Sequence, residues 1–263
     1  MTVKTGGMTT PGTRTTDALT DALLDRFLGE LRALAPVAVW AHGSLGGGDY
    51  QEGRSDLDLI AVLDGPIGPG TAWQVGKLHA RLRTDPLAPL LHCTYLSDAT
   101  TANPERRHLT WAHSELFRRT VTPVTRRELH TFGRVLYGKS PGELLPVVAD
   151  RQLTDFVVRD QRDFWRPTVD KAHLWTQDVW VDLGLVTFAR ATMTLRDGSL
   201  LSKREALDLL PGLGAPVKVV EDIARRRYGQ EGGRVDAGWR ERRGELTRDY
   251  LGDAIDHLVT SYT

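Results

Sequence analysis

The apolar residues of the chain follow one pattern in its first half and another in its second. Near the start, four apolar residues recur at four-residue steps: Leu19, Leu23, Phe27 and Leu31. This stripe predicts a helix from Thr16, which can cap it, to about Ala35. Short apolar runs then predict three strands, at 37–41, 56–63 and 89–96. The first half therefore combines strands and helices.

Other segments of the first half have weaker patterns. Residues 71–83 predict a helix between the second and third strands, and 125–137 predict a helix closed by Gly138. Between these helices, beyond the third strand, residues 99–125 are polar and irregular, and we predict no regular element there. Residues 1–15 are rich in Thr and Gly without an apolar period, so we expect a disordered tail.

From about Leu153 to the end of the chain the pattern is helical. Five helices are predicted, at 153–166, 173–195, 203–210, 217–228 and 238–259. The second is long and apolar, which places it at the centre of a small bundle. The sequence thus predicts an α+β protein. A small mixed sheet with helices at 16–140 precedes an all-helical bundle at 141–263, and a ligand cleft lies between them.

Composition excludes several classes of protein. The 263 residues are 40% hydrophobic and carry no formal net charge, as in ordinary globular proteins, and they lack the basic excess of a nucleic-acid binder. The single cysteine, Cys93, excludes an internal disulfide framework and a cysteine-rich zinc site. No apolar run is long enough to span a membrane, and no signal-peptide core is visible at the N-terminus. We therefore expect a cytoplasmic protein.

The stretch between the first two strands carries the chemistry. Gly43-Ser44 follows the first apolar run, three further glycines come next, and Asp56 and Asp58 open the second strand. Side chains alternate along a strand, so the two carboxylates share one face. Mg²⁺ is usually held by one or two carboxylates together with substrate phosphates, and glycines let the backbone approach phosphates closely. A hairpin with an acidic turn would explain each Asp, but not the whole combination.

The motif resembles the signature of a known superfamily. Gly43-Ser44, eleven residues and then Asp56-Leu57-Asp58 are similar to the pattern of nucleotidyltransferases with a polymerase-β-like fold. The likeness is greatest to the aminoglycoside adenylyltransferases that modify streptomycin and spectinomycin. The gap is one residue longer than in those enzymes, and a turn tolerates the insertion. The resemblance implies that 16–140 is the catalytic domain and 141–263 the substrate-binding domain.

The resemblance also implies roles for single residues. Asp56 and Asp58 would hold the metal, and the nucleotide would be bound by Gly43, Ser44, Arg54, Ser55, Arg190 and Lys203. The segment from Arg190 through Gly198 to Lys203 is similar to the one whose Arg and Lys reach the phosphates in these enzymes. Each of these two residues also has an alternative to phosphate binding. Arg190 could form an ion pair with Asp182 or another neighbour, and Lys203 could be a solvated residue at the start of a helix.

The third strand departs from the family. Relatives present there an acid that often serves as base for the acceptor hydroxyl, whereas this chain has His92. A neutral imidazole can take a proton but is not a favoured Mg²⁺ ligand. His92 is therefore our candidate base. Asp98, at the end of the strand, is the second candidate, although a turn or cap role suits it better.

The sequence says least about the residues that would bind the acceptor. An acidic cleft would suit a cationic acceptor, and the candidates are Trp111, Asp178 and Asp182, with Glu105 and Glu115 as further acids. Trp111 is equally compatible with a place in the core, where large aromatic side chains are common.

Together these features predict a Mg²⁺-dependent nucleotidyltransferase. It would move AMP, or another NMP, from ATP or a related nucleoside triphosphate to a hydroxyl of a small polar, aminoglycoside-like acceptor, as in antibiotic resistance. The alternatives are a catalytically impaired nucleotide-binding or regulatory protein of the same fold and an enzyme that nucleotidylates proteins. We expect no nucleic-acid or membrane partner, and a monomer or homodimer.

Overall fold

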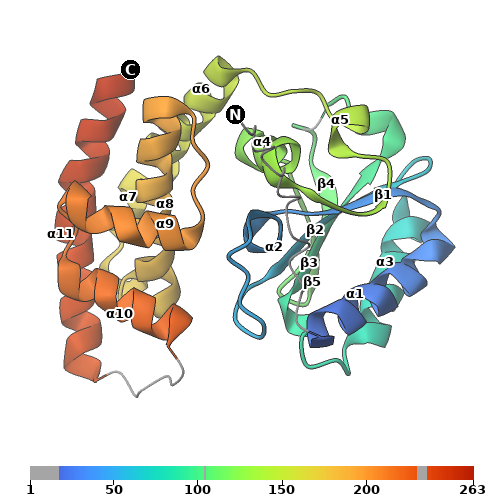
Figure 1. Ribbon diagram of the computed structural model, residues 1–263, viewed down its shortest axis with the longest axis horizontal. Coiled ribbons are helices and arrows are strands. Elements are labelled where there is room, and N and C mark those ends of the chain that lie inside the picture. The colour runs from blue at the N-terminus through green and yellow to red at the C-terminus, as the bar shows by residue number, and fades with distance from the viewer. Residues whose placement is uncertain (1–17, 104, 230–235) are drawn as a thin grey trace, which may run out of the picture.

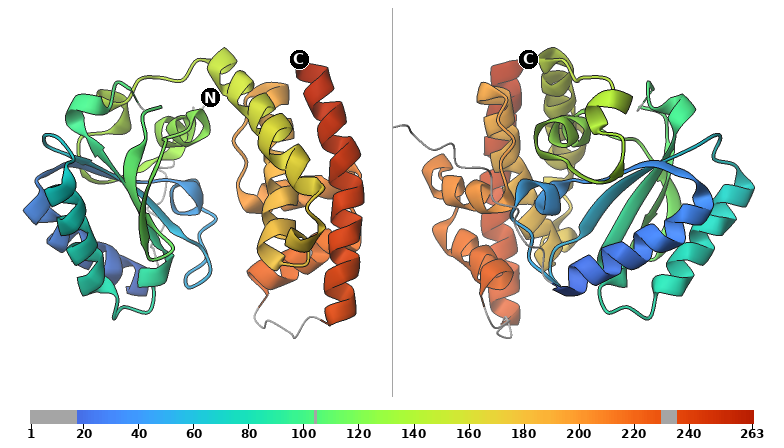
Figure 2. Two further views of the ribbon diagram at one scale, coloured as in Figure 1. Left: turned by 180° about the vertical axis from the view of Figure 1, so that it is seen from behind. Right: turned by 45° about the vertical axis from the view of Figure 1, so that its right-hand side comes forward.

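The structure is a computed structural model and describes residues 18–103, 105–229 and 236–263. A sheet with its helices forms one half, and a helical bundle forms the other (Figure 1). Figure 2 shows that the two halves lie beside each other and that the chain passes once between them, after α5 (Pro141–Leu144). The mixed-sheet α+β class predicted from the sequence is confirmed. The predicted tail at 1–15 and the cap at Thr16 lie outside the described residues.

The sheet has the strand order β5-β4-β3-β2-β1-β6. Its strands are β1 (Pro36–Ala41), β2 (Leu57–Leu63), β3 (Leu91–Ser97), β4 (His108–Ala112), β5 (Glu115–Arg119) and β6 (Arg134–Gly138). Among the strand pairs of the described residues, only β2 and β3 are parallel. Their register pairs Asp58 with His92 and Ile60 with Thr94. The parallel pairing needs a crossover, which α3 (Pro69–Leu82) supplies.

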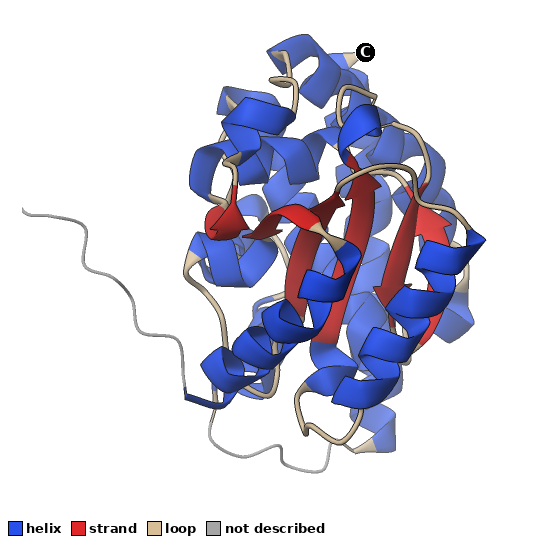
Figure 3. Ribbon diagram, turned by 90° about the vertical axis from the view of Figure 1, so that its right-hand side faces the viewer, coloured by secondary structure: helices blue, strands red, loops and turns tan. Residues whose placement is uncertain are grey.

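The two faces of the sheet are covered differently. α1 (Ala18–Leu31) and α3 lie over one face, as Figure 3 shows, and bury alternate residues of β2, Leu57, Leu59 and Ala61, in the largest core of this half. The opposite face buries Trp40 and Ile60 against α4 (Pro123–Phe132) and the segment around α5. This second face is also the one that turns toward the bundle, so polar residues on it can reach the other half.

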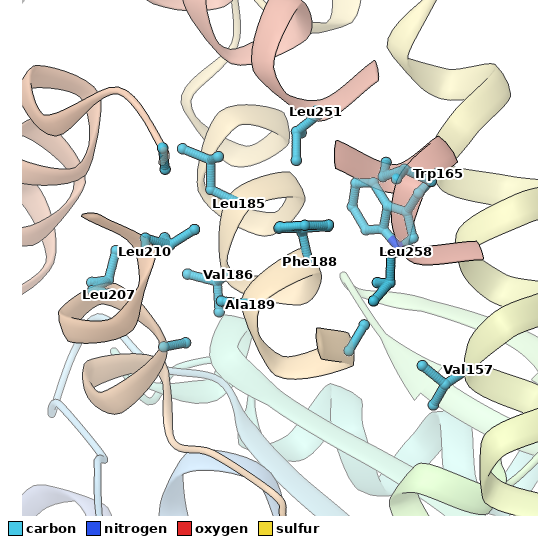
Figure 4. Packing of buried hydrophobic residues seen from close by; sticks show 14 of the residues in the cluster. Val157, Trp165, Leu185, Val186, Phe188, Ala189, Leu207, Leu210, Leu251 and Leu258 are labelled. Atoms are coloured by element: carbon cyan, nitrogen blue, oxygen red, sulfur yellow. The ribbon is translucent and has the colours of Figure 1, made fainter. Parts of the chain in front are cut away.

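The bundle is built around α8 (Asp178–Asp197), as its long apolar pattern predicts. α8 packs most extensively against α6 (Asp150–Asp160), α9 (Lys203–Leu209) and α11 (Ala237–Tyr262). Further elements of this half are a π-helical segment (Gln161–Trp165), α7 (Arg166–Val169) and α10 (Val217–Tyr228). Figure 4 shows Leu185, Val186, Phe188 and Ala189 of α8 meeting side chains from these neighbours in one apolar core.

Two sequence predictions about the first half are wrong. The stretch 99–125 contains β4 and β5, which the sequence did not reveal. Their turn places His113 and Ser114 at positive φ of 52° and 62°, where Asn-Gly or Asp-Gly is the usual signal. β5 is also an edge strand with exposed charged residues, so it lacks a clear apolar face.

The predicted helix at 125–137 is the second error. The helix ends at Phe132, and Arg134–Gly138 forms β6 instead, pairing with the free edge of β1. Gly43–Gly47, between β1 and β2, forms the short helix α2. Pairing with a distant strand is a tertiary effect, which local propensity does not contain.

A helix must be both long and apolar to cross a bilayer. In the described parts of the chain, none is both long and apolar enough to do so.

Candidate active site

The Gly43-Ser44 segment follows β1 directly and lies against the start of β2. The backbone N–H of His42 donates to the carbonyl oxygen of Asp58 at 3.0 Å, which holds the two segments together. Gly43 has φ +58°, and a Cβ there would lie 2.8 Å from the Asp58 Oδ2 atom. Glycine is required on both counts, since other residues rarely adopt this φ and have no room for a side chain.

The two carboxylates lie on the same face, as alternation predicts. Asp56 and Asp58 keep 45% and 28% of their side chains exposed. Burial by itself would raise the pKa of Asp58, but the His92 imidazole, His42 and Arg119 outweigh it and hold the pKa of this carboxyl below its usual value. Asp58 is therefore ionised at neutral pH and can bind a cation.

His92 lies directly behind the carboxylates. Its Nε2 is 3.8 Å from Asp56 Oδ1, and its Nδ1 is 3.8 Å from Asp58 Oδ1. The ring is buried and packs edge-on against His113, with centroids 4.5 Å apart. The predicted neighbourhood of His92 and the Asp pair is thus present. However, His92 is not among the described residues that line the cavities on either side of Asp56.

A cavity of about 550 Å³ opens over this face. Its wall includes Gly43, Ser44, Asp56, Asp58, Thr94, Arg119, Glu128, Arg190, Ser202 and Lys203, from both halves of the molecule. Backbone N–H groups at the start of α2, hydroxyls and cations therefore surround two carboxylates. Such a mixture suits a ligand that carries phosphates and a divalent cation together.

A buried carboxylate connects the two walls of this cavity. Glu128 of α4 accepts from Arg190 Nη2 of α8 at 2.7 Å, and its other oxygen is 3.2 Å from His42 Nδ1. Burial alone would raise the pKa of Glu128, but His42 and Arg190 reverse this and hold it below the usual value. The ion-pair alternative for Arg190 is thus realised, with Glu128 as the partner and not Asp182. Arg190 nevertheless lines the cavity.

Lys203 is the first residue of α9. The preceding Ser202 caps the helix, and Glu205 completes a capping box with it. Burial lowers the pKa of Lys203, with Arg227 and Arg190 adding to the effect and the two site carboxylates, Asp58 and Asp56, opposing it. Lys203 is thus a partly buried cation whose charge acts on the Asp pair.

A second cavity, of about 560 Å³, adjoins the first. Asp56 and Lys203 line both cavities. The second is otherwise formed by Arg54 and by residues of α8 and α10: Asp178, Val179, Asp182, Leu183, Val186, Ile223, Arg226 and Arg227. Arg54, predicted to bind nucleotide, therefore lies at the second cavity, with the predicted acceptor residues Asp178 and Asp182.

The other predicted residues are elsewhere. Trp111 lies on the opposite face of the sheet, stacked on His79 at 4.4 Å, so the core alternative is the one realised. Asp98 accepts from the N–H groups of Gly65 and Ala99, a turn role. Ser55 is buried and accepts from Arg227 Nη2 at 3.2 Å.

The two further acids also lie outside the cavities. Glu105 accepts from Gln152 Nε2, and Glu115 is exposed on the edge strand β5. Neither is among the described residues that line the two cavities. The acidic cleft expected from the sequence therefore reduces to Asp178 and Asp182.

Among the residues of the first cavity that sequence reasoning missed are three that surround the Asp pair and Arg190. His42, Arg119 and Glu128 come from the ends of β1 and β5 and from the middle of α4. A buried Glu in a short helix gives no local signal, because its partners are 62 and 86 positions away. Only the position of His42 beside Gly43-Ser44 could have pointed to the site.

The donor set fits a hard divalent cation completed by a ligand. Asp56 and Asp58 supply carboxylate oxygens at the cavity wall. Among the described residues no group of three or more His, Cys, Asp or Glu side chains is arranged to hold a metal by itself. Mg²⁺ commonly has few protein ligands and takes the rest from phosphates and water.

Comparisons with known proteins bear on the fold. Neither a protein-family model nor a curated protein sequence matches the chain. The structure is similar to the crystal structure of spectinomycin adenyltransferase AAD(9) from Enterococcus faecialis with ATP and spectinomycin. The chains are 15% identical, with a TM-score of 0.68 over 90% of this chain and 99% of the other. The chain therefore shares the fold of this adenyltransferase, a mixed sheet followed by a helical half, as expected from its motif.

Proposed function

We propose that the protein is a Mg²⁺-dependent nucleotidyltransferase that moves AMP, or another NMP, from a nucleoside triphosphate to a hydroxyl of a small molecule. The observation that carries this proposal is the junction of the two cavities at Asp56 and Lys203. A transfer reaction needs a donor and an acceptor on either side of one phosphorus atom. Two adjoining cavities with a carboxylate, Asp56, and a cation, Lys203, at their junction meet that need.

The first cavity is the proposed nucleotide site. Asp56 and Asp58 would hold Mg²⁺, which supplies charge neutralisation of the phosphates when bound. Ser44 and the N–H groups at the start of α2 would orient the triphosphate. Lys203 and Arg190 would stabilise the charge that develops on the leaving pyrophosphate. AAD(9), which shares the fold, was crystallised with ATP, which supports a nucleoside triphosphate as donor.

The reaction is an in-line displacement. The acceptor oxygen would form a bond to the α-phosphorus while the bond from that phosphorus to the bridging oxygen breaks and pyrophosphate leaves. The hydroxyl proton must go to a base. His92 is the proposed base because it lies 3.8 Å from both carboxylates. Because His92 is buried behind the carboxylates, three other candidates for the base remain: Asp98, Glu105 and water. The turn role of Asp98 and the distant position of Glu105 favour water among these.

Two alternative functions retain nucleotide binding but differ in whether the nucleotidyl group is transferred and to which acceptor. A nucleotide-binding or regulatory protein without transfer is favoured by His92 at the position where relatives carry an acid. A protein-nucleotidylating enzyme would need an open approach to the second cavity. A cytoplasmic location and a monomeric or homodimeric state remain predictions. The aminoglycoside-like acceptor also remains one, supported by the spectinomycin in the AAD(9) crystal and opposed by charges described in the next subsection.

The decisive experiment removes one carboxylate at a time. Asp56→Asn and Asp58→Asn should each abolish Mg²⁺-dependent ATP binding, measured by calorimetry, and pyrophosphate release with an acceptor panel, while circular dichroism shows an intact fold. The cation is left short of negative charge in either variant. Asp64→Asn is the matched control, because Asp64 follows the same strand, is exposed and lies outside both cavities. Parental ATP binding in both site variants would refute the metal assignment.

A further inference from the structure

The carboxylates of the second cavity are already paired. Arg226 of α10 contacts Asp182 through both terminal nitrogens, at 2.7 and 2.6 Å, in a bidentate ion pair. Arg226 also donates to Asp222 at 3.0 Å and lies 3.9 Å from Asp178. A planar guanidinium held by several carboxylates is fixed in position. Arg226 therefore occupies the place from which a ligand cation would contact Asp182.

Asp178 has its own partner from α11. Arg243 is fully buried, donates to Asp178 through Nη2 and contacts Asp222 at 2.9 Å through Nη1. A buried arginine cannot lose either partner without a large cost, because its charge would be left unpaired away from water. The pairing of Asp178 is thus as firmly held as that of Asp182.

Two cations at the same cavity lack a carboxylate partner. Neither Arg54 nor Lys203 forms an ion pair with any residue that the structure describes. Arg54 donates instead to the carbonyl oxygen of Arg227 at 2.9 Å. Asp56, the remaining carboxylate of the wall, is the proposed metal ligand. With a cation bound there, the groups left to meet an acceptor carry a net positive charge.

One wall of the cavity is apolar. Val179 and Leu183 lie four residues apart on α8 and keep 52% and 40% of their surface exposed. Val186 and Ile223 continue this wall. Large exposed aliphatic side chains beside polar groups are typical of a ligand-binding surface. The wall can pack against a hydrocarbon ring or chain of the acceptor.

We propose that the acceptor is an anionic hydroxyl compound with an apolar face, and not a polycation. The proposal rests on the proposed transferase function and specifies its acceptor. Arg54 attracts the acid, the α8 wall covers the apolar part, and Arg226 excludes ligand amines from Asp182. An aminoglycoside would have to displace Arg226 or leave its own ammonium groups beside Arg54, which has no carboxylate partner among the described residues, and both are unfavourable.

Three matched probes test the charge preference: phenyl glucuronide, phenyl glucoside and phenyl 2-amino-2-deoxyglucoside. They share a phenyl face and sugar hydroxyls and differ in charge. Binding is measured by calorimetry with and without Mg²⁺ and a non-hydrolysable ATP analogue. We expect the glucuronide to bind roughly tenfold or more tightly than the amino sugar, a difference of about 1.4 kcal/mol. Tightest binding of the amino sugar, or no discrimination among the three, including no binding at all, overturns the proposal.

Arg226→Gln tests whether Arg226 excludes cationic ligands from Asp182. It frees Asp182 and should reverse the order, so that the amino sugar and spectinomycin gain at least roughly tenfold in affinity. Arg225→Gln removes the same charge one residue away, outside the cavity, and should keep the parental order. If Arg226→Gln folds, verified by thermal unfolding, and keeps the parental order, Arg226 does not exclude cations. If it does not fold, the order measured in the parent chain decides by itself.

Failure of this proposal is distinguishable from failure of the proposed function. Mg²⁺-dependent ATP binding is measured separately in the parent chain, and its absence would refute the transferase proposal alone. The probe series without nucleotide still reports the charge preference of the cavity. Conversely, normal ATP binding with tight binding of spectinomycin to the parent chain would retain the transferase and reject the anionic acceptor.

Discussion

At the scale of single residues, Gly43 and Asp58 define the proposed metal site. A methyl group at Gly43 would lie 2.8 Å from Asp58 Oδ2, so Gly43→Ala must displace that carboxylate. We expect a loss of roughly tenfold or more in Mg²⁺-dependent ATP affinity by calorimetry, about 1.4 kcal/mol. The variant also bears the cost of a non-glycine residue at φ +58°, about 1–2 kcal/mol.

A second glycine separates these two effects. Gly53 has φ +74° and nothing within 4 Å of its would-be Cβ. Gly53→Ala therefore carries a similar backbone cost without touching Asp58, and it should lose stability but keep its ATP affinity. Equal ATP affinities for the two variants would show that the close approach of Gly43 to Asp58 has no part in binding.

His92 permits a second prediction at this scale. If His92 takes the acceptor proton, His92→Ala should lower the rate of transfer by about 10²–10⁴-fold, the usual contribution of general base catalysis. His92→Glu should restore part of that rate, because it returns the acid that relatives carry. Single-turnover kinetics at saturating Mg²⁺ and ATP measure this step.

A purely structural role of His92 would give a different result for His92→Ala. His92 is buried between Asp56 and Asp58, and its removal can loosen both carboxylates. Weaker Mg²⁺-dependent ATP binding with a nearly unchanged transfer rate would make His92 a positioning residue. Transfer only in His92→Glu would favour the catalytically impaired alternative.

At the scale of elements, α8 owes its place in the bundle to a close contact. A Cβ at Gly184 would lie 2.7 and 2.8 Å from two ring atoms of Trp175. The indole is fully buried and fixed by its Nε1–H, which donates to the Thr168 carbonyl oxygen at 2.9 Å. Gly184→Ala should therefore lower the free energy of unfolding by about 1–3 kcal/mol, the usual cost of overpacking. Urea unfolding measures the change.

Gly29 provides the matched helical control. It is exposed on α1, and a Cβ there would meet nothing within 4 Å. Gly29→Ala should raise the free energy of unfolding by up to about 1 kcal/mol, because alanine is the better helix former. A stabilising effect of both substitutions would mean that Trp175 moves aside and that α8 tolerates a wider spacing.

At the scale of the whole molecule, buried carboxylates join the two halves. Glu128 of α4 contacts Arg190 of α8, and Asp49 accepts from the backbone N–H of Arg204 and the hydroxyl of Tyr228. These contacts connect the sheet half to α8, α9 and α10 around the proposed site. The relative position of the halves, and so the shape of both cavities, depends on them.

Glu128 should make stability depend on pH. Its pKa is lower in the folded protein than the ordinary value of 4.5. The stabilisation is therefore complete above that ordinary value and is lost as the pH falls through the lower, folded-state pKa. Glu128→Gln should lower the free energy of unfolding at about pH 7 by about 2 kcal/mol, the range for a hydrogen bond to a charged group.

Urea unfolding at a series of pH values checks this prediction. The parent chain should lose more stability than Glu128→Gln between about pH 5 and about pH 2. Glu241→Gln, at an exposed position of α11, serves as control and should follow the parent. Parallel curves for the parent and Glu128→Gln would show that Glu128 does not link protonation to folding.

The sequence by itself determined the strongly periodic elements and the core of the site. Alternation along β2 was enough to place Asp56 and Asp58 on one face with Leu57 on the other. The long apolar helix at the centre of the bundle was predicted for the same reason. Such features depend on residues within one turn or one strand, so consecutive positions contain them.

Only the tertiary structure decided which distant residues meet. β6 forms because β1 offers it an edge, Glu128 is buried because Arg190 and His42 reach it, and Asp182 is paired because α10 places Arg226 beside it. Each contact joins segments far apart in the chain. Their free energy comes from burial and charge pairing that no local pattern contains, and for that reason the sequence predicted an acidic acceptor cleft where the structure has a charge-paired one.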